Sequence, residues 1–271
     1  MNAAQFRIAL LGVLVLAGLI WLAVTPPFGQ DRTYHDFADQ RPMLGIPHAL
    51  NVVSNAPFVI FGLLGILFVV RPSNWNNPQV FAACWERWAL LTLFVFVTLT
   101  GIGSSYYHAQ PSNSTLFWDR LPLTVVFMTF FVLVFADRVS PRLGPWLWLP
   151  LVAMGIFGVA YWHWSESQGR GDIRFYGLVQ FLPLLMLPVI LLAFPARRFR
   201  TADLVAILAW YGLAKLLELL DGQVYSANGI VSGHTLKHLV AALGALWMLR
   251  VLTKQAKPAL HFRRTPLPAN S

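Results

Sequence analysis

The chain has 271 residues, of which 57% are hydrophobic and only 11% are charged, whereas an ordinary soluble domain has about 25% charged residues. This composition excludes an ordinary soluble protein and is typical of a chain that spans a membrane. The formal net charge is +9, but the distribution of the basic residues described below does not fit a nucleic-acid-binding surface. The single cysteine, Cys84, excludes intrachain disulfides and metal sites built from several thiolates.

Eight apolar runs follow one another along the chain, and each is close to the length of about 20 residues that a bilayer core requires. They are Ile8–Val24, Leu50–Val70, Trp88–Tyr107, Leu121–Phe135, Trp146–Trp162, Phe175–Phe194, Leu204–Leu220 and Leu236–Leu252. The runs are continuously apolar, whereas the strands of a membrane barrel alternate apolar and polar residues. Because only helices and closed barrels can satisfy the backbone in lipid, we expect one domain of membrane helices with short connections.

The first run could be a signal peptide, since it is short and follows a single basic residue, Arg7. The sequence AVTPPFGQ after it lacks a small-x-small cleavage site, which favours a retained helix. The orientation of the other seven helices is the same in both cases.

The basic residues predict the orientation of the bundle. With a cytoplasmic amino terminus, the opposite side receives only Arg32, Arg41, Arg170 and Arg174. The cytoplasmic side receives Arg7, Arg71, Arg87, Arg138, Arg142, Arg197, Arg198, Arg200, Arg250, Lys254, Lys257, Arg263 and Arg264. This asymmetry follows the positive-inside rule, so the carboxyl terminus is expected in the cytoplasm.

Polar residues gather where the third and fourth runs meet, in the segment Gly101 to Pro122, GIGSSYYHAQPSNSTLFWDRLP. Helix counting places His108 at the non-cytoplasmic end of the third helix and Asp119 at the non-cytoplasmic start of the fourth. The last helix starts on the same side with SGHTLKHLVAALGA, so His234 and His238 lie in its first two turns. We therefore expect these residues at one depth near one membrane face.

The spacing of these residues predicts a catalytic zinc site. His234 and His238 are four residues apart, and so are Ser104 and His108, which puts each pair on one face of its helix. Three neutral imidazoles with an open fourth position are typical of catalytic zinc. Asp119 could then act as general base on a zinc-activated water, and Ser104 could donate a hydrogen bond to the developing oxyanion.

Each residue also has a purely structural interpretation. His108 could be an interfacial anchor at a helix end, and Asp119 could cap the fourth helix. However, two imidazoles on one helix face near hydrocarbon are costly without a purpose. The convergence of all these groups at one depth favours the metal site.

Other polar residues receive lesser roles. Lys215 and Glu218 are three residues apart in the seventh run and are expected to pair, and Asp221 after them could join the site. Asn51 and Asn55 in NVVSN are expected to form hydrogen bonds between helices. The outer segment YWHWSESQGRGDIRFY predicts an interfacial cover with an aromatic belt.

The motifs resemble those of the alkaline ceramidases. NVVSNAPF, GSSYYHAQPSNSTLFWDRLPLT and SGHTLKHLVAA carry the resemblance, which extends from about Asn51 to His238. That family belongs to a superfamily of seven-helix membrane hydrolases that includes the adiponectin-receptor-like proteins. The resemblance implies a seven-transmembrane-helix bundle. The apolar runs predict one extra N-terminal hydrophobic helix in this all-α membrane fold, and the seven-helix family core lacks that helix. The chain then divides into this first helix (1–25), a ceramidase-like domain (26–254) and a cytoplasmic basic tail (255–271).

Carried over residue by residue, the resemblance implies zinc ligation by His108, His234 and His238, water activation by Asp119 and transition-state support by Ser104. The implied reaction hydrolyses the amide bond of ceramide, or of a related N-acyl lipid, to a sphingoid base or other amine and a fatty acid. The expected partner is a membrane lipid and not a nucleic acid.

Calcium (Ca2+) is a point of departure from the family. The animal enzymes have a calcium site near the amino terminus, to which an acid three residues before the N-x-x-S-N motif contributes. Here His48 stands at that position, and Asp31, Asp36 and Asp39 do not have the spacing of that site. We therefore consider a calcium ion doubtful.

Two functions other than a zinc-dependent lipid amidase stay open. A receptor or sensor of the adiponectin-receptor type would keep zinc as structural support, and the motif alone does not separate it from an enzyme. A metal or proton transporter would need polar residues along a path across the membrane, whereas the candidate ligands cluster at one depth. The amidase is favoured, with a substrate that reaches the site laterally from the bilayer.

Overall fold

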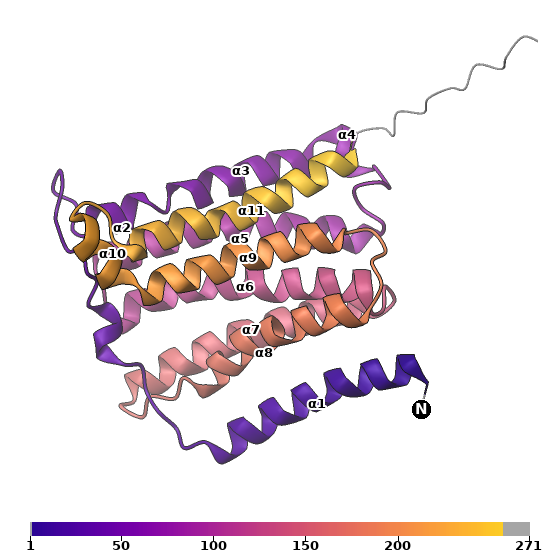
Figure 1. Cartoon of the computed structure of the whole chain (residues 1–271), viewed down its shortest axis with the longest axis horizontal. Coiled ribbons are helices and arrows are strands. Elements are labelled where there is room, and N and C mark those ends of the chain that lie inside the picture. Colours follow the sequence, from indigo (N-terminus) through magenta and orange to yellow (C-terminus); the bar gives the residue numbers. More distant parts are fainter. Residues whose placement is uncertain (1, 257–271) are drawn as a thin grey trace, which may run out of the picture.

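The computed structural model describes residues 2–256, and these form helices joined by short connections (Figure 1). The long helices are α1 Ala3–Val24, α3 Ala56–Val70, α5 Cys84–Ala109, α6 Asn113–Arg138, α7 Gly144–Ser167, α8 Arg174–Ala193, α9 Thr201–Leu219 and α11 Gly233–Ala256. The short ones are η1 Arg32–His35, α2 Ala49–Val53, α4 Pro72–Trp75 and α10 Asp221–Asn228. The expected basic tail falls, from residue 257 onward, outside the described residues.

The predicted all-α membrane fold is confirmed. Within residues 2–256, 7 helical segments are long and apolar enough to cross a bilayer, and they include α1 and the combined α2–α3 segment. Helix α9 coincides with the remaining apolar run but carries Asp203, Lys215 and Glu218 along its 19 residues. It nevertheless runs alongside the others in the bundle (Figure 1).

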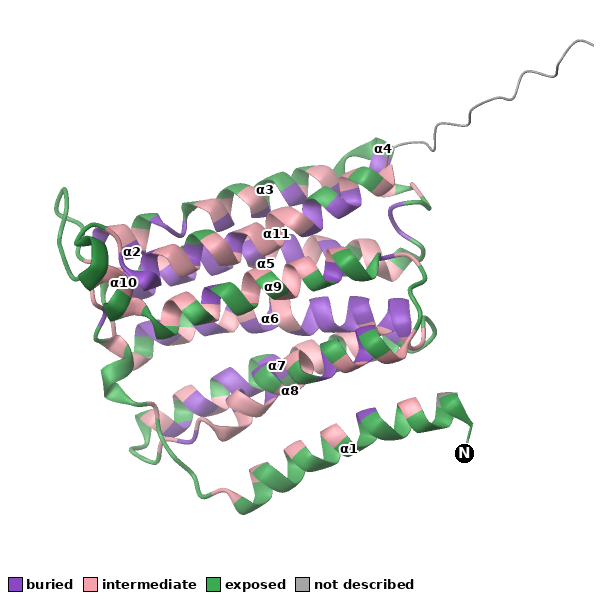
Figure 2. Cartoon of the chain, in the orientation of Figure 1, coloured by how far each residue is buried: buried purple, intermediate pink, exposed green. Residues whose placement is uncertain are grey.

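Helices α5 and α6 form the centre of the bundle. They pack along each other, α3 covers α5, and α7 and α8 cover α6. Helix α11 lies between α3 and α9. The burial pattern agrees with this arrangement, since α6 is buried along most of its second half while α1 is mostly exposed (Figure 2).

Helix α1 lies at the edge of the bundle, where it packs against α8 (Figure 1). Only 6% of its apolar window is buried, and its exposed residues are large and hydrophobic. An apolar helix with so little protein contact is suited to lie against lipid chains.

The second apolar run is broken into α2 and α3 at Ser54 and Asn55. Pro57 stands at the start of α3, and because proline has no backbone N–H and restricts its neighbours, it ends the helix that comes before it. The break leaves Ser54 and Asn55 buried at the same end of the bundle as α10 and the start of α11.

Helix α6 begins earlier than the apolar run that predicts it. It starts at Asn113, and the Ser112 hydroxyl caps it by accepting a hydrogen bond from the Thr115 N–H at 3.2 Å. Asp119 therefore lies in the second turn of the helix and not at its first residues. The alternative of Asp119 as a helix cap is wrong, because Ser112 fills that role.

Candidate metal centre

Three histidines from two helices form a buried triangle. His108 lies in the last turn of α5, and His234 and His238 lie in the first two turns of α11. His108 Nε2 is 3.3 Å from His234 Nε2 and 3.2 Å from His238 Nε2. The relative exposures of the three residues are 1%, 5% and 4%. The structure thus brings together all three histidines that the sequence predicts as ligands.

The donor set fits a tetrahedral metal ion. Zinc–nitrogen bonds of about 2.0–2.1 Å hold the nitrogens of a tetrahedral site about 3.3–3.4 Å apart, which matches the two Nε2 separations. One ligand atom from each histidine can be chosen so that all three lie within 4.8 Å of one another. Among the described residues, this is the one group of three or more possible ligands that could hold a metal ion. Three imidazole nitrogens are a donor set that suits zinc, copper, iron and nickel.

A hydrogen-bond chain orients His238. Its Nδ1 lies 2.8 Å from the Ser54 hydroxyl, which in turn lies 3.1 Å from the Asn51 carbonyl oxygen. If Nδ1–H donates to Ser54 and Ser54 donates to Asn51, the Nε2 lone pair is left free to point at the other two rings. Thr235 donates to the Asn51 side-chain oxygen at 2.7 Å, so α2 and α11 are held together beside the site.

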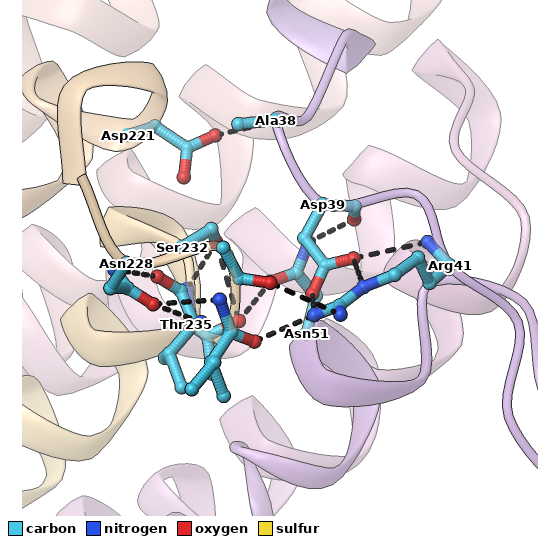
Figure 3. A network of polar contacts seen from close by, with 11 residues as sticks. Ala38, Asp39, Arg41, Asn51, Asp221, Asn228, Ser232 and Thr235 are labelled. Atoms are coloured by element: carbon cyan, nitrogen blue, oxygen red, sulfur yellow. Dashed lines mark hydrogen bonds and ion pairs between the residues drawn. The ribbon is translucent and has the colours of Figure 1, made fainter. Parts of the chain in front are cut away.

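One carboxylate and one serine fix the start of α11 on the neighbouring segments (Figure 3). Asp221 accepts the His234 backbone N–H at 2.7 Å and the Ala38 backbone N–H at 2.9 Å. Ser232 accepts the Thr235 backbone N–H at 3.1 Å. Because these acceptors satisfy N–H groups that a helix start leaves free, they hold the first turn of α11 and with it the His234 ring.

The segment before α2 closes over this end of the bundle. Asp39 accepts two hydrogen bonds of 2.9 Å from Arg41, whose guanidinium also donates to the Ile230 carbonyl oxygen at 2.6 Å (Figure 3). Phe37 places its ring 4.6 Å from both the His108 and the His234 rings, and it is itself buried. An apolar cover of this kind limits access of water to a metal site.

The acidic residues near η1 do not gather around a common point. Asp39 is engaged by Arg41, and Asp31 caps η1 through the Thr33 backbone N–H at 2.9 Å. Asp36 is exposed. Among the described residues, no group of acids meets the geometry of a metal site, so the structure offers the doubtful calcium no carboxylate cluster.

A large cavity adjoins the histidines. Its volume is about 790 Å³, and its walls come from α1, α5, α6, α8, α9 and α11. Ser104, Asp119 and His238 line it together, so the two predicted catalytic residues and one predicted ligand share a surface. His108 and His234 are not among the residues that line it. Most of the lining is apolar and includes Phe130 and Met248.

A close approach of α5 and α6 positions Ser104 and Asp119. An added Cβ at Gly103 would lie 2.0 Å from the Trp118 carbonyl oxygen. The absence of a side chain at Gly103 therefore lets the backbones of the two helices touch one residue away from each predicted catalytic side chain.

The lesser predictions are also resolved. Lys215 and Glu218 form the expected ion pair, and Glu218 additionally accepts a hydrogen bond from Lys237 at 2.5 Å. Asn51 forms the expected interhelical bond to Thr235. Asp221 reaches the site through the backbone of His234 and not as a ligand.

Sequence reasoning missed several residues of the site. Ser54, Phe37, Arg120 and Lys237 all contact or line it, and none has a recognisable spacing of its own. A usable signal existed for Arg120 and Lys237, because a cation within an apolar helix is costly and is usually functional. For Ser54 the signal was Pro57, which marks the helix break at which the Ser54 hydroxyl contacts His238.

Comparisons of this chain with the models of known protein families and with curated proteins find no match. The likeness to the alkaline ceramidases therefore rests on the motifs, and the assignment of an activity rests on the site.

Proposed function

We propose that the protein is a zinc-dependent membrane amidase that hydrolyses N-acyl lipids. The observation that carries this proposal is the buried triangle of His108, His234 and His238 beside an apolar cavity that also contains Ser104 and Asp119. The resemblance to the alkaline ceramidases supports the same reaction, with ceramide as the first candidate substrate.

The catalytic role that we assign to each group follows from its position. A zinc ion held by the three histidines would lower the pKa of a water molecule and polarise the amide carbonyl. Asp119 accepts a proton from the attacking water, and the same carboxyl group later delivers it to the leaving nitrogen. Ser104 donates a hydrogen bond to the carbonyl oxygen as negative charge develops there. The water oxygen forms the new bond to the acyl carbon, the C–N bond breaks, and a fatty acid and an amine result.

The cavity suits a lipid substrate. A volume of about 790 Å³ with a mostly apolar lining lies within the range of sites that enclose small amphiphiles. Burial of each methylene of an acyl chain contributes about 0.8 kcal/mol when the chain leaves water. The lipid would reach the site from the bilayer, so its chains need never cross an aqueous phase.

The positive-inside pattern supports a site on the non-cytoplasmic side. The start of α11, the end of α5 and the start of α6 share one end of the bundle. At the opposite end, Arg138 is the last residue of α6, Arg71 follows α3, and Arg198 lies between α8 and α9. We infer that the carboxyl terminus faces the cytoplasm and that products leave on the opposite side.

The test uses purified full-length protein with fluorescent short-chain ceramide and other N-acyl lipids, with and without a zinc chelator. We expect fatty-acid release that the chelator abolishes and that His234→Ala eliminates. Asp119→Asn should lower the rate by about 10²–10⁴-fold, as expected for loss of a general base. Asp36→Asn makes the same change at an exposed carboxylate and should retain the activity. Bound zinc without turnover of any N-acyl lipid would contradict the amidase and favour a receptor.

A further inference from the structure

The polar part of the cavity contains more cations than carboxylates. Arg120, Lys215 and Lys237 line it together with Asp119 and Glu218. Glu218 is shared by the two lysines, with which it forms ion pairs. Asp119 and Arg120 are neighbours in the sequence but do not form a salt bridge with each other or with any other described residue. The lining therefore carries one more positive than negative charge, and Arg120 has no ion-pair partner among the described residues.

Arg120 is buried and only partly satisfied. Its relative exposure is 6%. Its Nη2 donates a hydrogen bond to the Gln30 side-chain oxygen at 2.6 Å, whereas Nη1 is buried without a hydrogen-bond partner. The amide of Gln30 is neutral, so this contact orients the guanidinium without balancing its charge.

Aromatic rings hold the guanidinium in a fixed place. Its central carbon lies 4.3 Å from the ring centre of Trp162, 4.7 Å from that of Tyr176 and 5.4 Å from that of Tyr34. These cation–π contacts stabilise a cation, but they leave the Nη1 donor unused. Gln30, Tyr34 and Tyr176, which surround the guanidinium, line the same cavity as Arg120.

A buried cation without an anionic partner carries a large desolvation penalty. An oxyanion supplied by a ligand would offset it, because the planar guanidinium binds carboxylates and phosphates through two parallel hydrogen bonds. Arg120 lines the cavity, so an oxyanion of a ligand there can approach the guanidinium, and the two lysines that share Glu218 add to the positive potential.

We propose that Arg120 binds the anionic head group of an amphiphile whose acyl chain fills the apolar part of the cavity. This inference rests on the proposed function in one respect, namely that the amphiphile is also the substrate. The substrate is then an N-acyl lipid whose amine portion carries a carboxylate or a phosphate, rather than neutral ceramide. Arg120 directly follows Asp119 in α6, so a bound head group lies close to the residues that act on the amide.

Binding tests this inference without any turnover. The probes are the fluorescent amphiphile 11-(dansylamino)undecanoate and its methyl ester, titrated into zinc-loaded full-length protein. We expect the wild-type protein to bind the carboxylate at least tenfold more tightly than the ester. Arg120→Gln should reduce this ratio to within about twofold of one, and Arg120→Lys should retain part of it. Arg170→Gln, the same change at an exposed arginine, should leave the ratio as in the wild type.

Two outcomes would overturn the anion site. One is equal binding of the carboxylate and the ester by the wild-type protein, which needs no variant to fold. The other is a preference for the carboxylate that survives Arg120→Gln but disappears with a zinc chelator, since the anion would then bind at the metal centre.

Hydrolysis separates this inference from the amidase proposal. The matched substrates are N-dodecanoylglycine against its methyl ester, and ceramide 1-phosphate against ceramide, so that carboxylate and phosphate are tested apart. We expect the ratio of kcat/KM for an anionic over a neutral substrate to exceed ten and to fall at least tenfold in Arg120→Gln. Turnover without any anionic preference would overturn the inference and keep the amidase. Arg120-dependent binding of the carboxylate probe without any turnover would keep the anion site and contradict the amidase.

Discussion

Replacement of Ser54 by alanine tests whether the hydrogen bond to His238 supports a metal site. The Ser54 hydroxyl lies 2.8 Å from His238 Nδ1, and the relative exposures of the two residues are 6% and 4%. Because this position is buried, bulk water does not reach His238 Nδ1 in place of the missing hydroxyl. The next polar group, the Asn55 amide nitrogen, is 3.5 Å away and is itself a donor, so it cannot accept the Nδ1–H.

The magnitude follows from this geometry. A partner of a metal-ligating histidine contributes about 10–100-fold to metal affinity, which corresponds to about 1.4–2.7 kcal/mol. A buried donor without an acceptor costs about 1–3 kcal/mol, in the same range. We therefore expect Ser54→Ala to raise the zinc dissociation constant by about 10–100-fold.

The assay is competition for zinc between the purified protein and a chelator of known affinity. Ser105→Ala is the matched control, because Ser105 also donates to the α2 segment, to the Val52 carbonyl oxygen at 3.0 Å, but does not contact a histidine. Zinc affinities that agree within twofold between Ser54→Ala and the wild type would refute the reasoning. An equal loss in Ser105→Ala would assign the effect to the α2–α5 contact instead.

Two further changes probe the framework of the site by thermal unfolding. Gly103→Ala should lower Tm, because its Cβ would meet the Trp118 carbonyl oxygen at 2.0 Å and overpacking costs about 1–3 kcal/mol. Gly212→Ala is the control and should leave Tm unchanged, because its Cβ meets no atom within 4 Å. Equal shifts of Tm in the two variants would contradict the close approach of α5 and α6. The Arg41 guanidinium holds the pKa of Asp39 below its ordinary value of 3.8, so the stability contributed by this carboxylate is present above about pH 4. This stability is lost as the pH falls through the lowered pKa of Asp39, so the Tm difference between Asp39→Asn and the wild type should shrink as the pH falls below about 4. A Tm difference at pH 3 equal to that at neutral pH would disprove the contribution of the Asp39–Arg41 pair.

The features that depend on residues close together in the sequence could be predicted from the sequence. Continuous apolar runs predicted the long helices, since a bilayer dictates their length and composition. The four-residue spacing of His234 and His238 predicted one shared helix face, and helix counting brought His108 to the same end of the bundle. These three residues meet as expected because periodicity and alternating helix direction together leave few other arrangements.

Other parts of the site depend on contacts between segments and had no local signature. Asp119 looked like a helix start because the apolar run begins after it, but Ser112 extends α6 by two turns of mixed polarity. Helix α10 escaped prediction because its 8 residues are neither long nor apolar. The contact of Phe37 with two histidines arises from a loop that folds back over the bundle, which no periodic pattern encodes.

The central claim is that the three histidines hold one zinc ion. Elemental analysis together with X-ray absorption on purified full-length protein tests it most directly. We predict about one zinc per chain with three nitrogen ligands at about 2.0–2.1 Å, and loss of that zinc in His108→Ala, His234→Ala and His238→Ala. Zinc content that is unchanged in these variants, or a zinc-exposed wild-type protein that holds no metal, would contradict the account.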